Sequence, residues 1–428
     1  MSRQNQTDDQ PSGPQTGKLL QSGIIFSAIS FLTNVGNLAF QAVLGRHLTA
    51  SGDYGSANSA LNAIMPLLGL LPAVATFAVT HYIAHFNAIG DGARLQGLLA
   101  GCRKFLFHLT IFGSALAILV VIPLGGFFHF NENLMLITLG CTLLGLWASL
   151  ATALCQGLAW FKRLALIGFI GMMLRVSFGW FVTLKWPSQE TAVLASVFAL
   201  LANLVLLFWK KDLSLRGRAV SPWNREFVLY LVVSMAFVVG NYCFTVGDVL
   251  VMQRYFSGAD RDAYTAAERL AAGLPTAVGP LLAVFFTYRS TQHTGAALRE
   301  QLKLIGLYAA GLVCGAAALF ALRIFCLKLI GKYTPEAADM IGQLAVTMIF
   351  VGLLQAIGMW SLASRWSKIS LFFGGLGLVY WLTLFVIGRT PASLLQTMPV
   401  AAGIAFAALF LVWLIAMRTH KIGAPEPG

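Results

Sequence analysis

Charged side chains are scarce in this chain. Only 11% of its 428 residues are charged, and Asp and Glu together number 16. A soluble domain usually carries about 25% charged residues, so the water-soluble classes of protein are excluded. The sequence also lacks a phosphate-binding glycine loop, a paired-carboxylate motif and a nucleophile elbow. We therefore expect a protein that is not an enzyme and that uses no cofactor.

Cysteine is also sparse, and its spacing excludes the usual metal and redox motifs. The six cysteines lie in apolar segments without a CxxC pair. We expect no metal site and interpret the cysteines as small buried residues.

Hydrophobic residues make up 58% of the chain, and the mean hydropathy is +0.76. A membrane-spanning helix needs about 20 apolar residues. The sequence contains twelve such segments, near 20–44, 55–86, 104–127, 134–158, 164–184, 191–209, 226–252, 263–288, 302–325, 337–361, 369–388 and 396–417. This predicts an all-α polytopic membrane protein with about twelve transmembrane helices. The two longest segments are expected to tilt, or to kink at Pro66, Pro72, Pro275 or Pro280.

The net charge of +13 comes from 29 Lys and Arg residues, most of which fall in connections on one side of the predicted bundle. This bias indicates membrane topology rather than nucleic-acid binding, and it places both termini in the cytoplasm. The predicted organisation is a disordered cytoplasmic tail (1–17), a six-helix bundle (18–209), a basic cytoplasmic linker (210–225), a second six-helix bundle (226–417) and a cytoplasmic tail (418–428).

The two predicted bundles share a repeated stretch, residues 41–62 and 248–271. In each, an Arg (Arg46 or Arg254) ends one helix, a polar turn with an Asp follows, and a Tyr (Tyr54 or Tyr264) opens the next helix. Because six is an even number, both halves enter the membrane from the same side. The halves are therefore predicted to be parallel repeats.

The helices that lead each half carry a polar stripe at helical spacing. The first contains Ser27, Ser30, Asn34, Asn37 and Gln41, and the seventh contains Ser234, Asn241, Thr245 and Asp248. The second segment adds Asn58 and Asn62, and Glu268 holds the position equivalent to Asn58. These groups either join helices by hydrogen bonds or line a hydrated cavity between the halves; their recurrence favours the cavity.

Four charges lie inside the predicted segments and away from their end residues: Arg175, Asp248, Glu268 and Arg269. Charges in a membrane are costly and indicate function by default. Asp248 and Glu268 are candidates for ion coupling, or for structural ion pairs with Arg254 or Arg269. Arg175 has no acidic residue in its own helix, so it needs water, a partner from another helix or an anionic substrate.

A second repeated pattern follows the fourth and tenth segments. Gln156 precedes Lys162 and Arg163, and Gln355 precedes Arg365, with tryptophans between them. These residues either bind a polar head group on the cytoplasmic side or anchor the helix ends at the interface. His81, His85 and His108 are also expected to be interfacial.

The stretches LGRHLTASGDYGSANSALNAIMPLLGLLPAVATFAVTHYIA and DVLVMQRYFSGADRDAYTAAERLAAGLP resemble the helix signatures of bacterial polysaccharide and oligosaccharide flippases. The Gln156–Arg163 stretch resembles their fourth-helix exit. These flippases belong to the multidrug/oligosaccharidyl-lipid/polysaccharide (MOP) exporter superfamily.

The resemblance implies a V-shaped, MATE-like protein of the bacterial inner membrane that alternates between inward- and outward-open states. It also implies a lipid-linked oligosaccharide as cargo, and glycosyltransferases and a polymerase as pathway partners. With only two arginines within the segments, a neutral or mildly charged glycan is favoured. The candidate cavity residues are Asn34, Asn37, Gln41, Asn58, Asn62, Arg175, Asn241 and Arg269.

Three other functions stay open. A drug/cation antiporter of the same superfamily would use Asp248 and Glu268 to couple H⁺ or Na⁺. A membrane glycosyltransferase or ligase would need a sizeable extracytoplasmic loop, and every predicted outer loop is short. A non-transporting subunit of a polysaccharide synthase would not need the repeated polar stripe.

Overall fold

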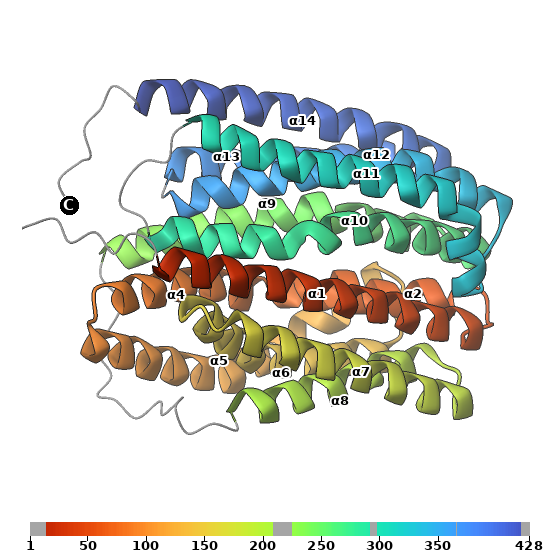
Figure 1. The fold of residues 1–428 in the computed structure, drawn as a ribbon. Coiled ribbons are helices and arrows are strands. Elements are labelled where there is room, and N and C mark those ends of the chain that lie inside the picture. The colour runs from red at the N-terminus through yellow and green to blue at the C-terminus, as the bar shows by residue number, and fades with distance from the viewer. Residues whose placement is uncertain (1–13, 209–224, 292–297, 365, 421–428) are drawn as a thin grey trace, which may run out of the picture.

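The computed structural model describes residues 14–208, 225–291, 298–364 and 366–420, and the regular structure in these ranges is helical (Figure 1). The helices run side by side along one direction. The predicted linker, apart from Arg225, and most of both predicted tails lie outside the described residues.

Every predicted segment corresponds to a helix or to a series of helices. The first half contains α1 (Pro14–His47), α2 (Asp53–Ser59), the π-helix η1 (Ala60–Ile64), α3 (Met65–Leu68), α4 (Leu70–Ala88), α5 (Gly92–Phe127), α6 (Glu132–Gly157), α7 (Phe161–Lys185) and α8 (Gln189–Phe208). The second half contains α9 (Arg225–Tyr255), α10 (Gly258–Thr291), α11 (Leu298–Ile330), α12 (Pro335–Ala363), α13 (Ser367–Ile387) and α14 (Pro391–His420).

Membrane-spanning character is clearest in eight of these helices, which are long and apolar enough to cross a bilayer by length and composition. They are α6 to α9 and α11 to α14. The four remaining rods, α1, the α2–α4 series, α5 and α10, lie alongside them in the same bundle (Figure 1). The chain is an all-α polytopic membrane protein.

The second rod is interrupted, as the sequence predicts for an over-long segment with prolines. A π-helical turn occupies Ala60–Ile64, Pro66 lies in the first turn of α3, and Gly69 separates α3 from α4. In contrast, α10 is continuous through Pro275 and Pro280. The helix also begins six residues before Tyr264, at Gly258, so the prediction that this tyrosine opens the helix is wrong.

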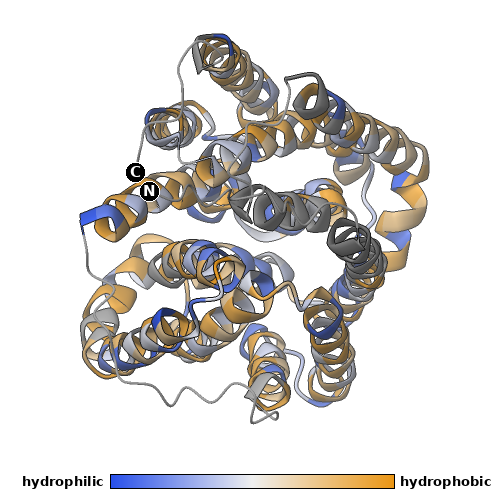
Figure 2. Ribbon diagram, turned by 60° about the vertical axis from the view of Figure 1, so that its left-hand side comes forward, coloured by the Kyte–Doolittle hydropathy of each residue, from blue (hydrophilic) through white to orange (hydrophobic). Residues whose placement is uncertain are grey.

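The two halves use the same helix pairings in the same order. In the first half α1 packs along α7, α4 along α6, and α8 along α6 and α7. In the second half α9 packs along α13, α10 along α12, and α14 along α12 and α13. This correspondence confirms the parallel repeat, and Figure 2 shows the two groups of helices from near their ends.

Glycines allow α9 and α13 to approach closely. A Cβ added to Gly240 would lie 2.8 Å from the Cα of Gly374, and one added to Gly377 would lie 2.5 Å from the Cα of Gly240. Small residues at helix contacts permit this backbone proximity in membranes. The α9–α13 contact therefore brings backbone against backbone. In the equivalent α1–α7 contact of the first half, a larger side chain intervenes, since the ring of Phe40 packs against Gly179.

The halves meet along two seams, α4 with α9 and α1 with α10. In the first seam the rings of Phe77 and Phe237 lie 5.3 Å apart and His81 stacks on Tyr230 at 4.7 Å. His81 is buried in this contact, and its position at the membrane interface stays a prediction. His85 is half-buried and His108 is exposed.

The cysteine prediction holds for some positions only. Cys141, Cys155 and Cys243 are buried, and all six cysteines are free thiols. Cys102 and Cys326 are half-buried, and Cys314 is exposed on the outer surface of the bundle. A thiol is apolar enough to face lipid, which explains the departure.

Candidate functional site

Two ends of the bundle are distinguished below. The basic end is where α1 begins and α14 ends, at the left of Figure 1, and the Lys/Arg-rich connections lie there. The opposite end carries the α1–α2 and α9–α10 turns, which are the two repeated stretches.

At the opposite end, the two repeated turns meet and join the halves. The carboxylate of Asp262 on α10 accepts hydrogen bonds from the backbone N–H of Gly52 at 3.3 Å and of Gly55 at 2.8 Å. Lys332 pairs with Asp262 at 3.2 Å and donates to the carbonyl of Leu48 at 2.9 Å.

Arg261 completes this arrangement by donating to the hydroxyl of Ser56 at 3.0 Å. We call Asp262, Lys332, Arg261 and their partners Gly52, Gly55 and Ser56 the closing cluster. The Lys332–Asp262 pair lies within the second half, and the other bonds of the cluster run from one half to the other. These crossing bonds hold the halves together at this end.

Behind the closing cluster, each half contains the same tyrosine hydrogen bond. In the first half the hydroxyl of Tyr54 donates to Oε1 of Gln41 at 2.9 Å. In the second half the hydroxyl of Tyr264 donates to Oδ2 of Asp248 at 2.7 Å. The repeat therefore extends to an equivalent side-chain contact, with a neutral amide in one half and a carboxylate in the other.

The second half surrounds this carboxylate with further buried polar groups. Asp248 and Glu268 are each 1% exposed and lie within electrostatic reach of one another and of Arg269. Tyr380 on α13 and Met398 on α14 close the site, and the hydroxyl of Tyr264 also contacts the Met398 sulfur at 3.3 Å. We call these residues the acidic site.

The structural ion-pair hypothesis is correct for one carboxylate and wrong for the other. Glu268 pairs with Arg269, as one interpretation of the sequence expected. Asp248 takes its hydrogen bond from Tyr264 instead, and Arg254 donates to the carbonyl of Phe127 at 2.8 Å.

Each carboxylate of the acidic site keeps an oxygen that lacks a hydrogen-bond partner within the described residues, Oδ1 of Asp248 and Oε1 of Glu268. Buried polar atoms are usually satisfied. Unsatisfied acceptors on two carboxylates within electrostatic range of one another are able to take a proton or a small cation. The described ranges contain no group of three His, Cys, Asp or Glu side chains that could hold a metal ion.

The first half contains a polar cavity of about 230 Å³. Its walls come from α1, η1, α3, α7 and α8, so it lies inside this half rather than between the halves. The polar residues that line it are Thr33, Asn37, Asn62, Arg175, Ser196 and Asn203.

Arg175 is the only charged residue among the lining residues of this cavity. Its guanidinium lies over the ring of Phe40, 4.2 Å from the centroid, a favourable cation–π geometry. Its Nε has no hydrogen-bond partner in the described part of the chain, and neither has the hydroxyl of Ser196 or Oδ1 of Asn203. The cavity therefore offers a cation with amide and hydroxyl groups, and no carboxylate lines it.

The predicted polar stripe divides between different roles. Asn34 donates to the carbonyl of Thr276 on α10 at 3.0 Å and so joins the halves. Asn37 and Asn62 line the cavity of the first half. Asn58 is buried and donates to the carbonyl of Tyr54 one turn earlier, and Asn241 accepts at its backbone carbonyl from Thr245.

The predicted head-group rim lies at the basic end but in two separate places. Gln156 and Lys162 flank the α6–α7 turn, where Arg163 lies over the ring of Trp160 at 5.6 Å. Gln355 lies near the end of α12, and Arg365 falls outside the described residues. The cation–π contact fits an interfacial anchor.

Sequence reasoning missed several residues of these sites. Ser196, Asn203 and Tyr380 are isolated polar residues in apolar helices, and nothing in the sequence pairs them with Arg175 or Asp248. Lys332 was counted only as a loop charge, and Asp262 was included only as part of the second repeated stretch.

Comparisons with known proteins identify the fold. No family model and no curated protein sequence matches the chain. Among solved structures, a MATE transporter in complex with MaL6 superposes with a TM-score of 0.68 at 12% identity, covering 94% of this chain and 97% of that one. An outward-facing multidrug resistance MATE transporter of the MOP superfamily gives 0.65 at 12% identity, with 94% and 96% covered. The Vibrio cholerae MATE transporter VcmN in its bent form gives 0.59 at 14% identity, with 95% and 99% covered. The chain has the fold of the MATE transporters of the MOP superfamily.

Proposed function

We propose that this protein flips a lipid-linked oligosaccharide, a glycan on an isoprenoid diphosphate, from the cytoplasmic to the periplasmic leaflet of a bacterial inner membrane. The observation that carries the proposal is the cavity of the first half. Arg175 supplies a cation there, and Asn37, Asn62 and Asn203 supply amide groups, with no carboxylate among the lining residues. Such a lining suits sugar hydroxyls and a phosphate better than a cationic drug.

Alternating access between the halves provides the transport step. We place the basic end in the cytoplasm, following the positive-inside bias. The closing cluster then seals the periplasmic end. Release of cargo on that side requires its bonds to break while the halves separate, and the reverse motion resets the transporter.

The acidic site is the proposed coupling site. Asp248 and Glu268 are buried near the closing cluster, each with an oxygen that lacks a partner in the described residues. Binding of H⁺ or Na⁺ there would remove the cost of two neighbouring buried carboxylates. Arg269 contributes by neutralising one of the two charges.

A multidrug antiporter of MATE type is the second candidate. Two observations favour it: the acidic site itself, and the likeness of the fold to a structure described as a multidrug resistance MATE transporter. Under this function, Asp248 and Glu268 would carry the coupling ion and the cargo would be an organic cation.

Proteoliposomes containing the purified protein test the proposal. Fluorescent lipid-linked oligosaccharide is reconstituted in both leaflets, and movement is followed by its accessibility to an added glycosidase. Wild type and Lys185→Gln, which changes an exposed basic residue on the same helix outside the cavity, are expected to flip this lipid. Arg175→Gln is expected to lose most of that activity.

The same vesicles distinguish the second candidate. Ion-driven efflux of a cationic dye, without movement of the lipid-linked glycan, would replace the flippase assignment with the antiporter. Flipping that survives Arg175→Gln unchanged would remove the cavity from the cargo pathway.

A further inference from the structure

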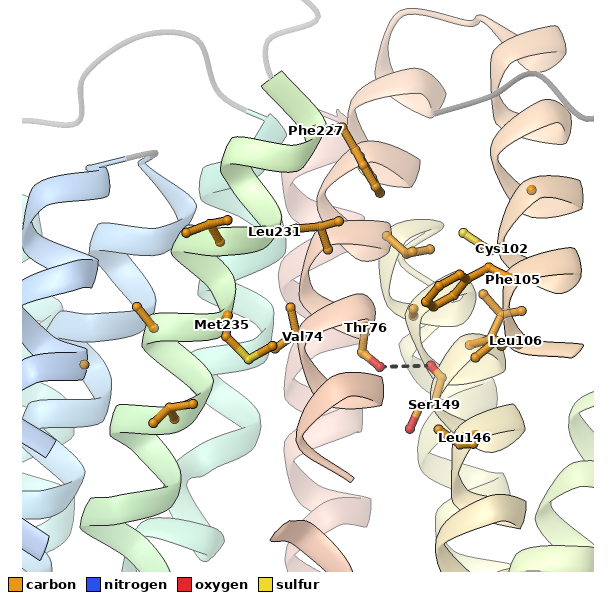
Figure 3. A pocket seen from close by; sticks show the side chains of 18 of the residues that line it. Val74, Thr76, Cys102, Phe105, Leu106, Leu146, Ser149, Phe227, Leu231 and Met235 are labelled. Atoms are coloured by element: carbon orange, nitrogen blue, oxygen red, sulfur yellow. Dashed lines mark hydrogen bonds between the residues drawn. The ribbon is translucent and has the colours of Figure 1, made fainter. Parts of the chain in front are cut away.

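A cavity of about 620 Å³ lies between the halves and toward the basic end. The first half supplies one wall from α4, α5 and α6, and the second half supplies the other from α9 and α13 (Figure 3). A volume of this size falls in the range of ligand pockets, roughly 300–1,000 Å³.

The lining of this cavity is almost entirely apolar. Thr76, Ser149 and Cys102 are its polar or weakly polar side chains, and the Thr76 hydroxyl donates to the Ser149 carbonyl at 3.5 Å (Figure 3). Water requires two to four polar partners to be held in a buried space. Hydrocarbon is therefore the suitable occupant.

The cavity is a groove that opens sideways onto the lipid-facing surface. Of its lining residues, Phe105 is 44% exposed, Val232 53% and Leu371 47%. These three side chains come from α5, α9 and α13. A hydrocarbon chain can therefore enter from the bilayer without passing through the protein interior.

Exposed cations lie on the same three helices as the groove walls. Lys368 precedes Leu371 by one turn on α13, and Arg225 precedes Val232 by two turns on α9. Arg103 and Lys104 lie between the lining residues Cys102 and Phe105 on α5. Glu226 is the acidic neighbour on α9, and the other nearby acid, Asp91, is paired with Arg94.

We propose that this groove binds one acyl chain of an anionic membrane phospholipid, whose phosphate head lies among these cations. An apolar groove beside several lysines and arginines matches the two parts of such a lipid, since basic residues near the membrane surface attract anionic lipid. The site is distinct from the cavity around Arg175 and does not rest on the proposed cargo.

Lipid binding in this groove also favours one conformation of the protein. Because the two walls of the groove belong to different halves, a bound acyl chain contacts both walls only while the halves keep the spacing seen in this structure. A ligand that prefers one state shifts the equilibrium toward it. The anionic lipid thus stabilises the conformation in which the opposite end is closed.

Gly375 offers a way to fill the groove without disturbing the fold. It lines the cavity, and a Cβ added to it meets no atom within 4 Å. Gly375→Phe therefore places a ring in open space. Val379→Phe is the matched control, because Val379 is 61% exposed on the same helix and does not line the groove.

Native mass spectrometry of the purified full chain, incubated with phosphatidylglycerol, phosphatidylcholine or a polyisoprenyl diphosphate, reads out the bound species. Wild type and Val379→Phe are expected to retain one phosphatidylglycerol about tenfold more than phosphatidylcholine, which corresponds to about 1.4 kcal/mol. Gly375→Phe is expected to lose this adduct. Equal retention of the two phospholipids, preferential retention of the polyisoprenyl diphosphate, or an unchanged adduct in Gly375→Phe would each overturn the proposal.

Alkylation of Cys102 provides a second measurement that needs no substitution in the groove. Cys102 lines the groove and is half-buried. In wild-type protein, phosphatidylglycerol is expected to slow its reaction with N-ethylmaleimide by about tenfold relative to phosphatidylcholine, and Cys314 serves as the exposed internal reference. Equal rates in the two lipids would refute occupancy of the groove.

Discussion

The closing cluster sets how readily the halves separate at the opposite end, and Asp262→Ala tests this. Asp262 accepts from two backbone N–H groups and pairs with Lys332, and both side chains are mostly buried, at 10% and 15% exposure. The ion pair with Lys332 lies within the second half, whereas the two hydrogen bonds from Gly52 and Gly55 cross between the halves. A hydrogen bond to a charged group contributes about 1.5–3 kcal/mol. Losing the two crossing bonds destabilises the closed state relative to the open one by about 3 kcal/mol or more.

A loss of about 3 kcal/mol changes the ratio of closed to open molecules about 150-fold. The reporter is Ser56→Cys in a background without the native cysteines, since Ser56 is buried at 7% in the closed state. In nanodiscs, its labelling by a charged maleimide is expected to rise about 100-fold when Asp262→Ala is added. Comparing two proteins that both carry Ser56→Cys cancels the effect of losing the Ser56–Arg261 bond.

Asp260→Ala is the control for this experiment. Asp260 lies on the same turn of α10 and is exposed, so its removal is expected to leave the labelling rate unchanged. Melting temperatures of both variants establish that the reporter responds to opening and not to unfolding. Equal labelling of Asp262→Ala and Asp260→Ala, with both proteins folded, would refute the role of the closing cluster.

Three further predictions follow from the sites. Arg175→Lys is expected to keep the protein folded but to lower transport about tenfold, because lysine keeps the charge without the planar contact to Phe40. Equal transport by wild type and Arg175→Lys in the vesicle assay would contradict this. Asp248→Asn is expected to retain the hydrogen bond from Tyr264 and normal thermal stability, while transport no longer responds to an imposed H⁺ or Na⁺ gradient; a preserved response would exclude Asp248 from coupling. Gly240→Ala is expected to destabilise the fold by about 1–3 kcal/mol through overpacking against α13, whereas Gly375→Ala, which enters open space, should melt like wild type.

The two tyrosine hydrogen bonds show how the halves have diverged in chemistry within one architecture. Tyr54 and Tyr264 donate to equivalent positions, yet the acceptor is Gln41 in one half and Asp248 in the other. Likewise, Asn58 satisfies its amide within its own helix, while Glu268 pairs with Arg269. This asymmetry confines the buried carboxylates to the second half, and it separates the proposed coupling site from the cavity around Arg175.

The residues of the candidate site were predictable only in part. Intramembrane charges are visible in any sequence because lipid excludes them, so Arg175, Asp248, Glu268 and Arg269 were all recognised. Their partners were not. Tyr380 on α13 lies within electrostatic range of Asp248, and Met398 on α14 contacts the Tyr264 hydroxyl that donates to Asp248. Both are more than 100 residues away from Asp248 in the chain, and no local periodicity predicts such an arrangement.

The sequence by itself determined the helices, their number and the parallel relation of the halves. These follow from apolar length, from loop charge and from an internal repeat, each of which acts locally along the chain. Only the tertiary structure decided what the polar residues do. Within the one predicted stripe, Asn34 forms a hydrogen bond to the other half, whereas Asn37 lines the cavity of the first half. The tertiary structure also joined the two repeated turns through Asp262. The physical reason is that a polar group buried in a membrane must be satisfied by whichever helix packs beside it, and packing is a property of the whole bundle.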